Sequence, residues 1–69
     1  MPLSMLDTGA SKPVIEIKGK DETRRFLESL GFTEGSTVTV VSKLAGNIIV
    51  SIKDSRIAID KTMANHIMV

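Results

Sequence analysis

The chain contains no cysteine, tryptophan or tyrosine, and its only aromatic residues are two phenylalanines. Without cysteine, neither disulfides nor thiolate metal ligands can supplement the core of a domain this small. Small secreted domains usually depend on disulfides, so we expect the 69-residue chain to fold in the reducing cytoplasm. Two phenylalanines also leave no platform on which bases could stack. The composition therefore disfavours secreted domains and nucleic-acid-binding domains.

Long apolar runs and an excess of one charge are also missing. No stretch approaches the ~20 apolar residues of a membrane span, and the start MPLSMLDTG lacks the basic and apolar regions of a signal peptide. Nine Lys and Arg residues are interspersed with eight Asp and Glu residues. A nucleic-acid-binding protein would normally gather positive charge on one face. We therefore expect a single domain, residues 1–69, without membrane insertion and without a nucleic-acid partner.

Apolar residues instead alternate in short blocks between turn residues, as in small all-β domains. Strands are predicted at residues 14–18, 38–41, 48–53, 56–60 and 67–69, with one helical turn at 61–64. Pro13 suits the start of the first strand because it lacks an N–H, and Gly46-Asn47 is typical of a hairpin connection. Five strands and one helix after the first predict a mainly β fold, a small SH3-like β-barrel with one short inserted α-helix. Closing the sheet would remove exposed strand edges.

The inserted helix is predicted at residues 21–30. Thr23, Phe26, Leu27 and Leu30 have the spacing i, i+3, i+4 and i+7, which places them on one face. Gly31 then stands where a helix commonly ends on a left-handed residue, and Phe32 follows as the apolar residue of a Schellman motif. We expect the glycine to end the helix and the phenylalanine to fix that end to the core.

An ordered set of motifs extends over nearly the whole chain. It consists of Leu6-x-x-Gly9, Val14-x-x-Ile17, Leu27-x-Ser29-Leu30-Gly31-Phe32-x-x-Gly35-x-x-Val38-x-Val40, Ile57-Ala58-Ile59 and Ala64-x-x-Ile67-x-Val69. In this order the sequence resembles the FeoA family of small ferrous-iron-transport accessory proteins, from about Leu3 to Val69.

The resemblance implies an SH3-like barrel and a cytoplasmic protein that is not an enzyme. It also implies a partner, the ferrous iron transporter, whose cytoplasmic GTP-binding part we expect the chain to bind. The same barrel forms the C-terminal domain of iron- and manganese-dependent repressors. A stand-alone module related to that domain is therefore one alternative, and a metal-binding carrier or sensor is another.

Catalytic and metal-binding side chains are scarce. His66 is the only histidine, and no motif pairs it with an acid or a nucleophile, so we expect it to point to solvent and predict no catalytic residue and no cofactor. Met63 and Met68 lie near it in the sequence, but methionine at such spacing is more often part of a core. His66 is therefore only a weak metal candidate. The segment G-F-T-E-G lacks the lysine of a phosphate-binding loop, so any GTP belongs to the partner.

A protein-binding surface remains. Leu27 and Leu30 are predicted to be core residues, whereas Phe26 is predicted to be partly exposed. Arg24 and Arg25 would then form a polar rim around it, a combination common in interfaces. Ile49 interrupts the alternation of its strand and is predicted to face outward. The candidate partner-binding residues are therefore Arg24, Arg25, Phe26 and Ile49, and the expected assembly is a monomer or a weak homodimer.

Overall fold

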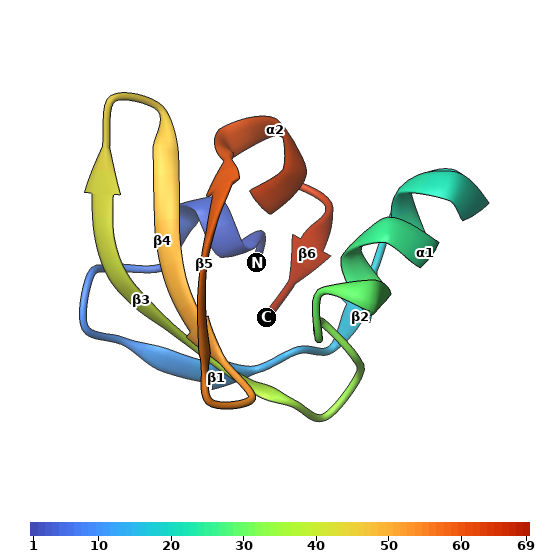
Figure 1. The fold of residues 1–69 in the computed structure, drawn as a ribbon, viewed down its shortest axis with the longest axis horizontal. Coiled ribbons are helices and arrows are strands. Elements are labelled where there is room, and N and C mark those ends of the chain that lie inside the picture. The colour runs from blue at the N-terminus through green and yellow to red at the C-terminus, as the bar shows by residue number, and fades with distance from the viewer.

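The computed structural model describes residues 1–69 and has a mainly β fold with six strands rather than the five predicted. In chain order the elements are η1 (Leu3–Met5, a 3-10 helix), β1 (Ser11–Pro13), β2 (Glu16–Ile17), α1 (Asp21–Ser29), β3 (Thr37–Leu44), β4 (Asn47–Ile52), β5 (Ser55–Asp60), α2 (Lys61–Ala64) and β6 (Ile67–Met68). They form a four-stranded antiparallel sheet in the order β1-β3-β4-β5 and a two-stranded sheet of β2 and β6. Figure 1 shows α1 on the side of the molecule opposite the β3–β4 hairpin.

The N-terminal strands differ from the prediction. Pro13 ends β1, which pairs with β3, instead of preceding a strand over residues 14–18. The chain then crosses from one sheet to the other, because the N–H of Val14 bonds to Ser36 and that of Ile15 bonds to Met68. Only residues 16–17 of the predicted strand pair as β2. Residues 11–13 show no apolar alternation, so their strand depends entirely on the neighbouring β3.

Two tight turns make the two hairpins of the larger sheet. Ala45 and Gly46 connect β3 to β4 with φ of 44° and 87°, so the Gly46-Asn47 prediction is shifted by one position. Lys53 and Asp54, with φ of 46° and 64°, connect β4 to β5. Positive φ at both central residues is the geometry that suits the twist of a two-residue hairpin.

The predicted end of the helix is confirmed. Gly31 has a φ of 108°, and its N–H bonds to the carbonyl of Glu28 while the N–H of Phe32 bonds to that of Leu27. This is the hydrogen-bond pair of the Schellman motif. The Phe32 side chain is fully buried, so the helix end is attached to the core.

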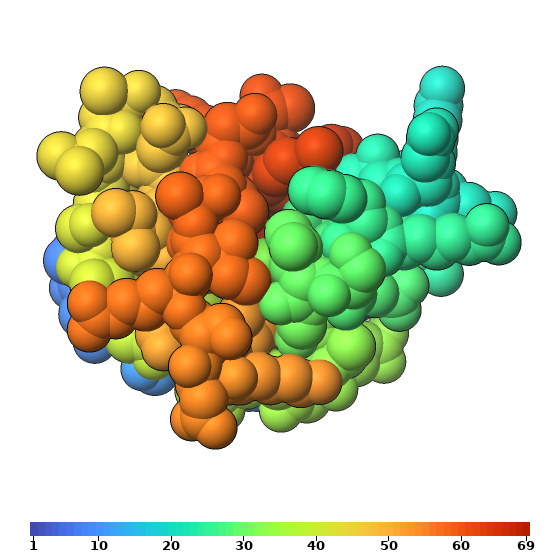
Figure 2. Space-filling view, in the orientation of Figure 1, coloured from blue at the N-terminus to red at the C-terminus, as the bar shows by residue number.

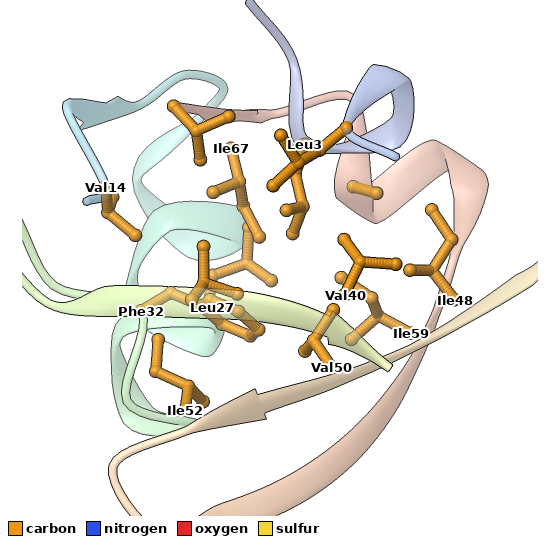
Figure 3. Close-up of a cluster of buried hydrophobic side chains, with 14 residues drawn as sticks. Leu3, Val14, Leu27, Phe32, Val40, Ile48, Val50, Ile52, Ile59 and Ile67 are labelled. Atoms are coloured by element: carbon orange, nitrogen blue, oxygen red, sulfur yellow. The ribbon is translucent and has the colours of Figure 1, made fainter. Parts of the chain in front are cut away.

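One apolar core joins both sheets and α1, as Figure 3 shows. Its buried residues are Leu3, Leu6, Val14, Leu27, Phe32, Val38, Val40, Ile48, Val50, Ile52, Ile59, Ala64, Ile67 and Val69. The two ends of the chain meet beside it, since Met1 and Val69 exchange backbone hydrogen bonds of 3.0 and 2.7 Å. The expected sheet closure is absent, because β1 and β5 are not paired with each other and the outer edge of β5 stays open.

Candidate protein-binding surface

Phe26 is half exposed on α1, as predicted, while Leu27 beside it is fully buried and Leu30 is partly buried. Phe26 and Leu30 form one wall of a groove between α1, β5 and α2. Six of the seven lining residues are apolar, and the full set is Phe26, Leu30, Ile57, Ala58, Ile59, Asp60 and Met63. Figure 2 shows this face, with β5 in orange beside the C-terminal half of α1 in green. We call this surface the Phe26 groove.

The two arginines predicted as a rim lie outside the lining of this groove. Arg24 forms an exposed ion pair with Asp21, one turn earlier on α1, at 3.4 Å. Such a pair contributes little to stability because water screens it. Arg25 is exposed, and at 100° per residue it lies on the solvent side of Phe26 rather than toward the core. Arg25 is therefore better placed than Arg24 to face a partner bound at Phe26.

Ile49 is partly exposed on β4. Its strand neighbours are Ser42 on β3 and Ala58 on β5. The pairing of β3 with β4 shifts between Val40 and Ser42, but burial still alternates along β4, so Ile49 is an apolar residue on the less buried face of its strand. Ile49 does not line the Phe26 groove, but its neighbour Ala58 does.

His66 was predicted to point to solvent, and the structure contradicts this prediction. The residue is partly buried in the turn before β6, and its carbonyl accepts a 2.7 Å hydrogen bond from the N–H of Lys18. A Cβ atom built on Gly19 would lie 3.2 Å from the His66 Nδ1. The imidazole therefore packs over the chain that leads into α1. No cluster of three or more His, Asp or Glu side chains is close enough together to hold a metal ion.

Six groove residues were not among the predicted site residues: Leu30, Ile57, Ala58, Ile59, Asp60 and Met63. Residues 57–59 form the I-A-I motif, where a small residue between two β-branched ones leaves room at a strand surface. That signal was present in the sequence. The sequence did not indicate that α1 lies opposite β5, the strand that contains this motif.

A second, more polar hollow lies beside the β3–β4 hairpin. It is bounded by Ser4 of η1, the β3–β4 hairpin and Lys61. Lys43 donates a 3.3 Å hydrogen bond across it to the carbonyl of Ser4. Its hairpin wall includes Leu44, which is exposed.

A family model described as the FeoA domain matches residues 1–69, the whole chain. The chain belongs to the FeoA family. A search of curated proteins found no match. FeoA proteins are accessory proteins of ferrous iron transport and are not known as enzymes.

Solved structures agree with this assignment. An iron uptake regulatory protein, FeoA, is 37% identical, with a TM-score of 0.90 over 97% of this chain and 89% of that one. The FeoA of Stenotrophomonas maltophilia, solved with zinc, is 27% identical, with a TM-score of 0.87 over 99% of this chain and 87% of that one. It is described as a prokaryotic SH3 domain protein and a candidate activating factor for ferrous iron transport. The SH3-like fold class is therefore confirmed.

The fold also occurs within a longer protein. A manganese-dependent transcriptional repressor is 23% identical, with a TM-score of 0.88 over 97% of this chain but only 39% of that one. This likeness concerns the fold alone. No helix of this chain has the length and apolar character needed to span a membrane.

Proposed function

We propose that this FeoA protein acts in the cytoplasm by binding the GTP-binding part of a ferrous iron transporter through the Phe26 groove. The observation that supports this most is the half-exposed Phe26 beside five other apolar lining residues. An aromatic side chain in an apolar depression is typical of an interface anchor. Membership of a ferrous iron transport family supports the choice of partner.

The mechanism we propose is regulation by occupancy. The chain presents no cluster of acid, base or nucleophile around the groove, where Asp60 is the only charged lining residue. The Asp60 carboxylate already accepts a 2.8 Å hydrogen bond from the N–H of Met63 at the start of α2. Binding would bias the conformation or assembly of the transporter, and a coupling free energy of about 1–3 kcal/mol is enough for useful regulation.

The test is an NMR titration of the isotope-labelled protein with the purified soluble GTP-binding domain of the transporter, with and without nucleotide. We expect shifts at Arg25, Phe26 and Leu30. Phe26→Ser should keep the domain folded and raise the Kd by about tenfold or more, because an anchor residue is lost from the interface.

A matched control is Ile15→Ser, which removes another largely exposed apolar side chain that does not line the groove. This variant should bind like the wild type. An equal loss in both variants, or a Phe26→Ser variant that binds normally, would contradict the assignment of the surface. No shift with the wild-type protein would contradict the assignment of the partner.

A further inference from the structure

The outer edge of β5 carries main-chain groups that have no partner. The Lys53-Asp54 turn joins β4 and β5 with two residues, so its flanking pair, Ile52 and Ser55, exchanges both hydrogen bonds. Hydrogen-bonded and non-bonded pairs alternate from there along an antiparallel ladder. Ile57 and Ile59 thus bond to β4, whereas Arg56 and Ala58 direct their N–H and C=O groups away from it.

Nothing else in the molecule satisfies these groups. Strand β5 is the last in its sheet. None of the hydrogen bonds made by turns, loops or caps involves the N–H or C=O of Arg56 or Ala58, and no side chain bonds to them. Both residues are exposed. An open edge of this kind pairs readily with another strand.

The open edge runs along the Phe26 groove, because Ile57, Ala58 and Ile59 line that groove together with Phe26 and Leu30. Side chains of a strand alternate between its two faces. A strand added beside β5 would therefore direct every second side chain toward the apolar residues of the groove. Its other side chains would lie beside the exposed side chains of Arg56 and Ala58.

Charges of both signs lie around β5, with a small positive excess. Lys53, Arg56 and Lys61 are basic, Asp54 and Asp60 are acidic, and the Asp60 carboxylate already accepts the N–H of Met63. Arg56 adjoins Ile57 on β5 and Lys61 follows Asp60, while carbon atoms of the Lys53 side chain lie 3.7–4.0 Å from the position of a Cβ on Gly31 at the end of α1. The only ion pair in the molecule joins Arg24 to Asp21. Lys53, Arg56 and Lys61 therefore keep charges without an acidic partner, and a bound segment with carboxylates would complement them.

We infer that β5 binds an extended, acidic segment of the partner protein by strand addition. The segment has apolar residues at alternate positions, facing Phe26 and Leu30, and carboxylates beside Arg56 and the lysines. Main-chain hydrogen bonds to Arg56 and Ala58 supply affinity, and the groove supplies selectivity. The identity of the partner rests on the function proposed above; the mode of binding rests on the open edge.

Ala58→Pro tests the main-chain pairing. Proline is tolerated on an edge strand where the N–H would face outward, so the variant should remain folded while losing the donor and blocking the neighbouring strand. Ala58→Thr is the matched control, because threonine keeps the N–H and favours strands. Titrated with the soluble GTP-binding domain, Ala58→Pro should raise the Kd about tenfold, and Ala58→Thr should leave it nearly unchanged.

Hydrogen exchange of the wild-type protein gives a second readout that needs no variant. The amides of Arg56 and Ala58 should exchange rapidly in the free protein and become protected in the complex. If the domain binds but these amides stay unprotected and the two Ala58 variants bind alike, strand addition is wrong while the proposed function stands. If the wild-type protein does not bind the GTP-binding domain at all, both strand addition and the proposed function are wrong. Protection that grows with the concentration of the protein alone identifies a second copy as the occupant and overturns the acidic-segment proposal.

Discussion

Phe26 and Leu27 are neighbours in the sequence, yet one is half exposed and the other is completely buried. A helix turns 100° per residue, so adjacent side chains cannot both face a narrow core. Leu27 contributes to the cluster that holds α1 against the sheets. Phe26 is left at the edge of that contact, where its apolar area stabilises the fold little and remains available for a partner.

This difference predicts unequal costs for two truncations. Leu27→Ala should lower the free energy of unfolding by about 2–5 kcal/mol, since it leaves a cavity in the core. Phe26→Ala should lower it by only about 1 kcal/mol, because half of its surface is already in water. Urea unfolding followed by circular dichroism measures both values. Similar losses would mean that Phe26 is a structural residue.

The elements of this protein are short, and their ends determine where the surfaces lie. Strand β5 starts after a turn with two positive φ angles and ends at Asp60, whose carboxylate caps α2. Helix α1 ends at the Gly31-Phe32 junction, which directs the chain into β3. These ends fix α1 opposite β5 and so form the Phe26 groove.

Gly31→Ala tests the helix end. With a φ of 108° at this position, an L-residue should cost about 1–2 kcal/mol. The cost should come from the backbone, because the nearest neighbouring atom to an added Cβ is 3.7 Å away. D-alanine at the same position, introduced by chemical synthesis, should recover most of the loss in a thermal unfolding experiment. Equal losses for the two alanine forms would point to crowding instead.

At the scale of the whole molecule, the two ends of the chain contact each other beside the core. The isolated bridge of Pro2 with Met68 and the bonds between Met1 and Val69 join the first and last residues. Leu3 in η1 is fully buried in the same core as Ile67 of β6. A domain of this size has only a few kcal/mol of stability, so losing a single buried side chain from this region is expected to matter.

Leu3→Ala should destabilise the protein by about 2–5 kcal/mol, although Leu3 is only the third residue of the sequence. Met5→Ala is the control, because Met5 is in the same 3-10 helix but is 67% exposed. Its effect should stay within about 0.5 kcal/mol. A thermal melt that shows no difference between the two variants would mean that the N-terminal segment is not part of the cooperative core.

Local patterns in the sequence determined the parts of the fold that depend on near neighbours. The helix at 21–30, its end at Gly31 and the burial of Leu27 follow from spacing and backbone preference, which act within one or two turns. The partial exposure of Phe26 followed from the same spacing. The ordered motifs also identified the family.

Only the tertiary structure decided the rest. Strand β1 is Ser11–Pro13, which becomes a strand because β3 lies beside it, and His66 is partly buried because the chain before α1 passes over it. The open edge of β5 and the groove beside it bring together residues from α1, β5 and α2. No local pattern encodes these placements, because strand order and helix position are set by the packing of one shared core among segments distant in sequence.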